Sequence, residues 1–371
     1  MTDDLGVYIH IPFCASRCDY CAFVTYVGVD DLHERYVDGV LREIEINAEL
    51  QEKSATSIYV GGGTPSRIDP TLLGKILAEI KKTSDCEVSV EVNPEDATAE
   101  RLGSLVDAGV TRFSVGVQST QEHVLKDLGR QHCGGSVKEI ADIVADSGVA
   151  TWSMDLIAGA TSERDADLQA TLEDVLDHES APPHLSCYLL SVEKGTPLSR
   201  DPARHPDDDT LARRYEIVDT ALEERGYEWY EVSNWSKPGH ESRHNQLYWD
   251  QGNYVGLGAG AHSHHSGYRS WNVANMDTYL KGVESGVRPL GGDEQLSIAT
   301  QDFEALALQI RTRKGVQTPK GFNPDALHGF VVKREGRVVL TQRGRLMANQ
   351  VTRLLSEQSE EFSLDLSRQL T

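Results

Sequence analysis

Apolar runs alternate six times with amphipathic segments in the first 225 residues, and this alternation constrains the fold more than any other feature. The apolar runs predict strands at residues 6–10, 57–60, 87–92, 112–117, 151–156 and 184–190. Helical periodicity predicts helices at 31–52, 70–82, 99–107, 136–146, 166–177 and 210–225. Strands joined by crossover helices form a parallel sheet, so we expect an α/β fold with its helices outside the sheet.

Six strand–helix repeats are too few to close an eightfold barrel. We therefore expect a partial, open TIM-like barrel, and a doubly wound open sheet is the alternative. Both architectures bind their ligands at the carboxyl ends of the strands. A loop with three cysteines directly follows the first predicted strand, at that end of the sheet.

The 371 residues suffice for one large α/β domain and a smaller appendage. Near residue 234 the chain becomes polar and aromatic, and a glycine- and histidine-rich tract follows at 256–265. Helical periodicity returns after Leu296, with a β-wing expected at 336–340 and an amphipathic helix at 341–356, as in a small winged-helix-like module. We predict a barrel at 1–233, a connecting segment at 234–290 and a C-terminal domain at 291–371.

The three clustered cysteines are Cys14, Cys18 and Cys21. Three thiolates can bind three irons of a [4Fe–4S] cluster, which leaves the fourth iron free to chelate a small molecule. Three thiols cannot all pair as disulfides, and neither His10 nor His33 completes a standard zinc-binding pattern. The cluster therefore favours radical chemistry with S-adenosylmethionine (SAM). The isolated cysteines of the predicted strands are expected to be core residues.

Polar groups follow several predicted strands and are expected to share one mouth of the barrel. The run 61–65, Gly-Gly-Gly-Thr-Pro, lets backbone groups approach a ligand, or forms only a tight turn. Glu91, Gln118 and Asp155 could bind ribose hydroxyls, an adenine edge or an amino group, or each could be a helix cap. Arg130 could pair with a substrate carboxylate, or form a surface ion pair.

His244 begins the run His-Asn-Gln-Leu-Tyr-Trp, which places aromatic residues close after an imidazole. An axial haem ligand and its pocket need this combination of groups. His262, His264 and His265 could serve in the same way or bind a metal. The alternative for each is a buried, hydrogen-bonded histidine.

Acidic residues outnumber basic ones by 58 to 36, giving a formal net charge of −22. Such a surface repels phosphate backbones, so no nucleic acid partner is expected. No run approaches the roughly 20 apolar residues of a membrane span, and the first residues lack the basic and apolar regions of a signal peptide. We therefore expect a cytoplasmic protein without a membrane span.

Taken together, these motifs resemble the oxygen-independent coproporphyrinogen III oxidase group of radical SAM proteins. The resemblance rests on Tyr-Ile-His-Ile-Pro-Phe-Cys with Cys-x3-Cys-x2-Cys, Gly-Gly-Gly-Thr-Pro-Ser, Glu-Val-Asn-Pro-Glu and Gly-Val-Gln-Ser, and it extends over nearly the whole chain. The oxidases carry a fourth cysteine two residues after the third, where this chain has Phe23, and tend to have a longer N-terminal segment. The motif at 244–249 resembles the HemW-type haem-chaperone branch of the group.

The resemblance implies roles for individual residues. It implies Cys14, Cys18 and Cys21 as ligands of a [4Fe–4S] cluster. It implies SAM contacts from Tyr8, Tyr20, Gly62, Gly63, Thr64, Glu91, Gln118, Arg130 and Asp155. It makes His244 the leading haem contact. One departure is the run Asp-Leu-Ile-Ala-Gly-Ala-Thr-Ser from Asp155, where relatives usually continue Gly-Leu-Pro, so a different loop shape is expected there.

The implied function is that of a haem chaperone that binds a [4Fe–4S] cluster, SAM and haem. Its implied partners are haem, haem-accepting respiratory proteins and an electron donor. The alternative is an enzyme of porphyrin biosynthesis that oxidatively decarboxylates coproporphyrinogen III, against which the absent fourth cysteine and the short N-terminal segment argue. A third alternative, a binding module without catalytic chemistry, conflicts with the intact cysteines and strand-end carboxylates.

Overall fold

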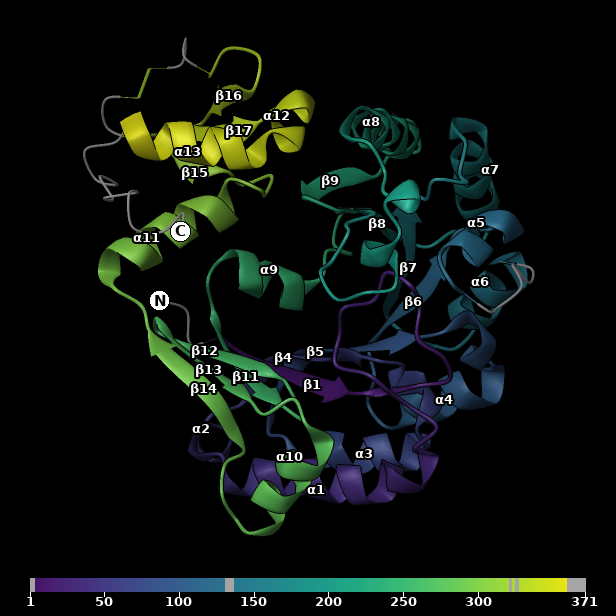
Figure 1. Ribbon diagram of the computed structural model, residues 1–371, viewed down its shortest axis with the longest axis vertical. Coiled ribbons are helices and arrows are strands. Elements are labelled where there is room, and N and C mark those ends of the chain that lie inside the picture. The colour runs from purple at the N-terminus through teal and green to yellow at the C-terminus, as the bar shows by residue number, and fades with distance from the viewer. Residues whose placement is uncertain (1–3, 131–136, 320–321, 324–326, 359–371) are drawn as a thin grey trace.

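The computed structural model describes residues 4–130, 137–319, 322–323 and 327–358, and its central feature is a twelve-stranded sheet (Figure 1). Six neighbouring strands of this sheet are parallel: β1 (Leu5–Ile11), β4 (Ala55–Gly62), β5 (Lys82–Val92), β6 (Arg112–Gln118), β7 (Thr151–Ala158) and β8 (His184–Leu189). They confirm the six predicted strands. The sheet has two free edges, β14 and β9, so it forms the expected open, partial barrel.

Helices connect the parallel strands and cover the outside of the sheet. They are α1 (His33–Ile46), α2 (Ala48–Glu52), α3 (Pro70–Glu79), α4 (Ala99–Asp107), α5 (Glu122–Asp127), α6 (Val137–Ala145), α7 (Asp165–Leu176) and α8 (Asp208–Glu224). Short 3-10 helices lie at Asp30–Leu32, Pro65–Arg67, Pro94–Asp96, Leu198–Arg200 and Pro202–Arg204. The single helix predicted at 31–52 is divided, because Asn47 is extended and its side chain accepts from Leu50 N to cap α2.

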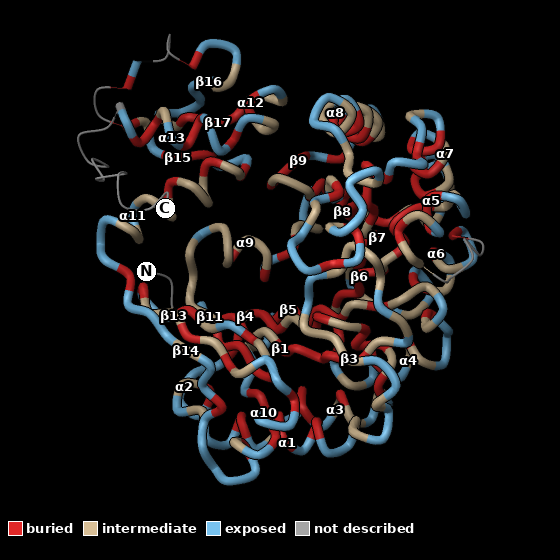
Figure 2. The backbone as a smooth tube through the Cα atoms, in the orientation of Figure 1, coloured by how far each residue is buried: buried red, intermediate tan, exposed pale blue. Residues whose placement is uncertain are grey.

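The sheet separates an apolar outer layer from a polar interior. On β5, Val88, Val90 and Val92 belong to the main hydrophobic core, and Glu87 and Glu91 alternate with them on the opposite face. The central strands are mostly buried, whereas the covering helices expose one face (Figure 2). The polar residues inside the barrel therefore lie on one continuous surface, along which a site can be built.

The segment 234–290, expected to connect two domains, instead supplies strands to the large sheet. It follows β9 (Glu228–Glu231) and contains β10 (Asn234–Ser236), α9 (Arg243–Trp249), β11 (Asn253–Leu257), β12 (His262–His265), β13 (Tyr268–Asn272), α10 (Met276–Glu284) and the start of β14 (Leu290–Gln295). β11 pairs in parallel with β1, and β12 to β14 extend the sheet in antiparallel fashion. The glycines of this tract concealed the strands, although Gly256 is required there: a Cβ would lie 2.0 Å from the carbonyl oxygen of His262.

The C-terminal residues form a small module with its own hydrophobic core. It contains α11 (Ile298–Gln309), β15 (Val316–Gln317), β16 (Val331–Arg334), β17 (Arg337–Leu340), α12 (Gln342–Leu346) and α13 (Ala348–Gln358). The wing predicted at 336–340 corresponds to the β16–β17 hairpin, and the predicted final helix is divided at Met347. An ion pair of 2.6 Å between Arg345 and Asp219 links the module to α8. The boundaries at 233 and 290 stay a prediction.

Candidate functional site

The three clustered cysteines line one cavity at the carboxyl ends of the parallel strands. Cys14 ends the short strand β2 (Phe13–Cys14), which pairs with β3 (Tyr26–Val27), and Cys18 and Cys21 lie in the loop between these strands. The cavity has a volume of about 630 Å³. Burial raises the pKa of the Cys14 and Cys21 thiols, and the neighbouring cysteines add to this increase because like charges would be close together.

The arrangement of the thiols fits an iron–sulfur cluster. In the described parts of the chain, no three His, Cys, Asp or Glu side chains converge on the position of a single metal ion. A [4Fe–4S] cube does not need such convergence, because each thiolate binds a different iron at a different corner. A mononuclear zinc site would need ligands that meet at one point. Cys133, which the sequence left without a role, lies outside the described residues.

Glu91 contributes a carboxyl group to the cavity and forms no ion pair with any described residue. Its Oε1 accepts from the Tyr59 hydroxyl at 2.9 Å, and its Oε2 accepts from the backbone N–H of Gly62 at 3.0 Å. Burial raises the pKa of Glu91 to about 7, although these two hydrogen bonds lower it. A carboxyl group whose pKa lies near neutral pH is typical of a binding or catalytic site.

The glycine run beside Glu91 brings the backbone itself to the cavity. A Cβ at Gly62 would lie 2.3 Å from the His10 ring, and one at Gly63 would lie 2.7 Å from the carbonyl oxygen of Phe13. Both positions line the cavity together with Thr64, whose hydroxyl donates to Cys14 Sγ at 3.7 Å. No larger residue fits at either glycine unless these neighbours move, so the packing of the chain requires glycine at both positions, and a role of the run in ligand binding stays a prediction.

Asp155 and Gln118 line the cavity from β7 and β6. The Asp155 carboxylate accepts from the Ser114 hydroxyl at 2.6 Å and from the Ser153 hydroxyl at 3.2 Å, and burial raises its pKa. Gln118 has φ +67°, a left-handed conformation that is costly for a residue with a side chain. Such strain persists where function requires it, and here it turns the chain at the cavity.

Arg130 supplies a positive charge to the cavity lining. Its guanidinium donates to Asn93 Oδ1 and to the carbonyl oxygen of Gly116, both at 3.2 Å. Its Nε is buried and has no hydrogen-bond partner among the described residues. A buried donor without a partner is rare and is satisfied when a ligand supplies an acceptor, such as a carboxylate. Tyr20 lines the cavity beside it.

Two of the residues for which the resemblance implied a SAM or haem contact, Tyr8 and His244, do not line the cavity, and neither do His262, His264 and His265. Tyr8 lies behind Tyr59, with the two rings stacked at 6.4 Å, and its hydroxyl bonds His10 Nδ1 at 3.0 Å. His244 is completely buried, with Nδ1 at 2.9 Å from the Ser57 hydroxyl and Nε2 at 2.9 Å from the Tyr248 hydroxyl. Burial lowers the pKa of His244 to about 3. Neither ring nitrogen is available to an iron ion in this conformation.

The sequence analysis missed several cavity residues, among them Tyr59, Ser114 and Tyr188, which lie on β4, β6 and β8. Ser114 lies two residues before Gly116 and four before Gln118, which also line the cavity, so the period of two could have identified it. Apolar and hydroxyl side chains in a buried strand resemble ordinary core residues, and this concealed them.

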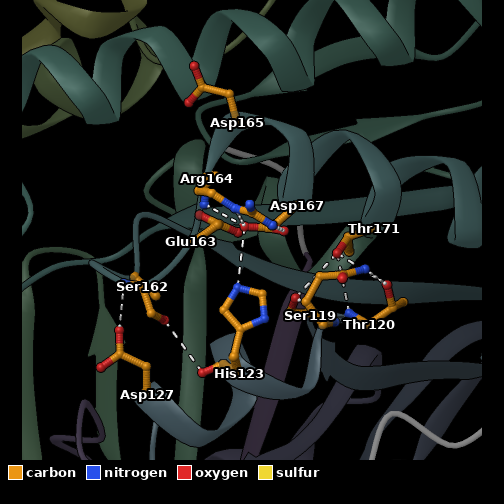
Figure 3. Close-up of polar contacts among 12 residues, drawn as sticks. Ser119, Thr120, His123, Asp127, Ser162, Glu163, Arg164, Asp165, Asp167 and Thr171 are labelled. Carbon is orange, nitrogen blue, oxygen red and sulfur yellow. Dashed lines mark hydrogen bonds and ion pairs between the residues drawn. The ribbon is translucent and has the colours of Figure 1, made fainter.

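The loop after β7, where the sequence departs from the pattern of its relatives, is held by contacts with α5. Ser162 N donates to Asp127 at 3.0 Å, and His123 on α5 lies 3.3 Å from Asp167 in the first turn of α7 (Figure 3). Behind this loop the buried carboxylate of Glu163 accepts from Gly159 N at 2.8 Å. The departure therefore leaves Asp155 in the cavity.

Comparisons with known proteins agree with this geometry. A profile of the radical SAM superfamily matches residues 8–175. The haem chaperone HemW of Mycobacterium tuberculosis (strain H37Rv) is 38% identical and covers 94% of each chain, and HemW of Bacillus subtilis (strain 168) is 31% identical over 93% of this chain and 97% of its own. The solved structure of the radical SAM enzyme coproporphyrinogen III oxidase (HemN) from Escherichia coli matches with a TM-score of 0.82 at 19% identity, covering 95% of this chain and 90% of that one.

The structural match shows a shared fold, and the whole-length sequence matches show kinship. No helix in the described part of the chain combines the length and apolar character needed to cross a bilayer. Membership of the radical SAM superfamily implies a [4Fe–4S] cluster and SAM as cofactors, and the cavity contains a donor set that fits both. The chain belongs to the HemW haem-chaperone family of radical SAM proteins.

Proposed function

We propose that this chain binds haem and delivers it to haem-accepting proteins, respiratory haem proteins among them. The proposal is carried by the similarity to HemW haem chaperones along nearly the whole chain, at 38% and 31% identity. The cavity adds support, because its cysteines and polar groups meet in space from six separate strand ends and loops. An electron donor and a cytoplasmic location belong to the same proposal, since an iron–sulfur cluster persists best in a reducing compartment.

We assign the [4Fe–4S] cluster to Cys14, Cys18 and Cys21, and SAM to the polar wall of the cavity. When bound, this pair of cofactors supplies one-electron cleavage of a sulfonium bond. Arg130 would donate a hydrogen bond from its free Nε–H to the SAM carboxylate. The remaining contacts would come from Tyr20, Gly62, Gly63, Thr64, Glu91, Gln118 and Asp155, all of which line the cavity.

We assign Tyr8 no direct role at this wall, because it stacks on Tyr59 and does not line the cavity. His244 as the haem contact would require its two hydrogen bonds to break and α9 to rearrange. Such a change would expose a histidine that is now completely buried. We therefore expect haem binding that survives the replacement of His244.

The competing function is oxidative decarboxylation of coproporphyrinogen III. The similarity to the E. coli oxidase, at 19% identity, concerns the fold alone. Phe23 occupies the position at which the oxidases carry a fourth cysteine, and its side chain is 63% exposed. This chain therefore has an apolar ring where the oxidases have a thiol, and this difference favours the chaperone role.

An anaerobic reconstitution tests the proposal. Protein loaded with iron, sulfide and SAM is titrated with haem, separated from free haem and mixed with a haem-free respiratory cytochrome subunit. We expect a complex of the protein with haem, and we expect this complex to load the subunit with haem faster than an equal amount of free haem does. The same preparation, incubated with coproporphyrinogen III and a reductant, is expected to yield no protoporphyrinogen. Failure of haem transfer, or formation of protoporphyrinogen, would reverse the assignment.

A further inference from the structure

The ring of Tyr59 stacks on two other rings. His244 stacks on it with ring centroids 5.5 Å apart and an interplanar angle of 25°, and Tyr8 stacks on it at 6.4 Å and 19°. Tyr59 lines the cavity, whereas the other two residues do not. His244 therefore lies one ring away from the cavity lining, in contact with Tyr59.

The imidazole of His244 is held in place on every side. Its two nitrogens bond the hydroxyls of Ser57 on β4 and Tyr248 on α9. The N-terminus of α9 is held in turn by Glu87, whose carboxylate accepts from the backbone N–H groups of Arg243 at 3.2 Å and of His244 at 3.1 Å. A ring fixed by both of its nitrogens and by its own backbone gives Tyr59 a rigid surface to pack on.

Tyr59 in turn has a direct effect on the ligand-binding groups. Its hydroxyl supplies one of the two hydrogen bonds that the described residues donate to Glu91, and Gly62 N–H supplies the other. If the Tyr59 ring moved, Glu91 Oε1 would lose its donor in a buried site, which is costly for a carboxylate. The direction of the Glu91 carboxyl thus depends on where the Tyr59 ring is held.

We infer that His244 is a positioning residue, which holds Tyr59 so that its hydroxyl keeps Glu91 directed at the cavity. The inference rests on the proposed function, in which Glu91 contacts SAM. It gives the motif at 244–249 a role in building the cofactor cavity, and none in coordinating haem iron. The alternative is that the stacked rings merely fill the barrel interior, in which case their contribution to SAM binding would be independent of the Tyr59 hydroxyl.

A double-mutant cycle with SAM affinity as the readout tests this inference on reconstituted protein. Tyr59→Phe keeps the ring and removes the hydroxyl, and a lost hydrogen bond to a charged group is expected to weaken SAM binding about tenfold. His244→Gln keeps polar groups for Ser57 and Tyr248 but removes the ring face, and is expected to weaken binding about threefold. The double variant should bind SAM no more weakly than Tyr59→Phe, because both changes act through one hydroxyl.

His184 provides a matched control, because it is also a buried histidine of the barrel interior whose Nε2 lies 2.8 Å from a tyrosine hydroxyl, that of Tyr230. His184→Gln is expected to leave SAM affinity unchanged. Haem stoichiometry should be the same in His244→Gln as in the wild type. Loss of haem in His244→Gln would assign its imidazole to the iron, and additive effects on SAM affinity would reduce the stack to ordinary packing; either result overturns the inference.

The test separates this inference from the proposed function. If the wild-type protein binds no SAM, the proposed cofactor site fails. The same cycle is then measured on the cofactor-free protein as shifts of the thermal unfolding midpoint. A shift in the double variant smaller than the sum of the two single shifts supports the positioning role, and a shift equal to that sum overturns it.

Discussion

Two glutamates on one strand show how the two ends of the barrel differ. Glu87 and Glu91 lie on the same face of β5, and both are largely buried. Glu87 accepts two backbone hydrogen bonds at the start of α9 and lies 4.0 Å from the guanidinium of Arg112. Glu91 accepts from the Tyr59 hydroxyl and one backbone N–H and forms no ion pair within the described parts of the chain, and burial raises its pKa to about 7.

This difference distinguishes Glu87, a carboxylate with a structural role, from Glu91, a carboxylate that is available to a ligand. A buried charge is costly unless a cation and hydrogen bonds compensate it, and Glu87 has both. Glu91 lacks the cation, so its charged form is disfavoured until a ligand supplies a complementary group. The α9 end of the barrel is therefore complete in itself, whereas the cavity end is completed by what it binds.

The largest effect is expected from removing the cofactor at the cavity end. Cys18→Ala should reduce the iron of reconstituted protein from about four atoms per chain to almost none, because a cluster held by two thiolates is not retained. Cys86→Ala, at a buried position on β5, should keep its iron and serves as the control. Iron and sulfide analysis after desalting measures both. If Cys18→Ala retained its iron, the cavity would not be the cluster site, and the difference described between the two ends of the barrel would no longer hold.

The next effect concerns stability at the α9 end. Glu87→Gln leaves the guanidinium of Arg112 buried without its counter-ion, so the free energy of unfolding should fall by about 3 kcal/mol. Glu91→Gln breaks no ion pair with a described residue, so it should lower the free energy of unfolding only slightly at pH 8. Denaturant unfolding of the cofactor-free protein gives both values. Equal losses for the two variants would show that the two ends do not differ as described.

The pH dependence of stability sharpens the comparison. The pKa of Glu91 is raised from 4.5 to about 7 by burial, so the folded protein keeps a proton that the unfolded chain has lost. This bound proton stabilises the folded state, and its contribution to the free energy of unfolding is complete below pH 4.5 and is lost as the pH rises to 7. The contribution amounts to about 3 kcal/mol at 1.36 kcal/mol per pKa unit.

Unfolding measured between pH 4.5 and pH 8 isolates this contribution when the wild type is compared with Glu91→Gln. The variant should lose less stability over this range. Glu163, whose pKa burial also raises to about 7, is present in both proteins and therefore cancels. Parallel pH profiles for the two proteins would contradict the raised pKa of Glu91.

The smallest effect concerns backbone strain at the cavity. Gln118→Gly relieves the left-handed conformation at φ +67° and should raise the free energy of unfolding by up to about 1 kcal/mol. It should also weaken SAM binding, since the amide side chain is lost from the cavity. Gln251→Gly, at φ +54° and outside the cavity lining, should gain similar stability without any change in SAM affinity. If Gln118→Gly and Gln251→Gly bound SAM with equal affinity, Gln118 would not be a SAM contact.

Much of the site could be predicted because it is encoded locally. The cysteine spacing, the glycine run and the polar residues after strands all occupy single loops or strand ends, and the parallel topology brings strand ends together without further information. Tyr59 and Tyr188 escaped because an aromatic residue within a strand has no local mark of function. His244 has the neighbours of a haem ligand in sequence, but one of them, Tyr248, bonds its Nε2, and Ser57 on the distant strand β4 bonds its Nδ1.

The sequence by itself determined the six parallel strands, the cysteine loop and the open form of the barrel, because periodicity and spacing act over a few residues. The tertiary structure alone decided that β11 pairs with β1, that α9 lies across the barrel interior and that Ser57 meets His244, 187 residues away. It also decided which of two glutamates on β5 has a cation beside it. Burial and charge compensation depend on what packs against a residue, and that is fixed only when distant segments meet.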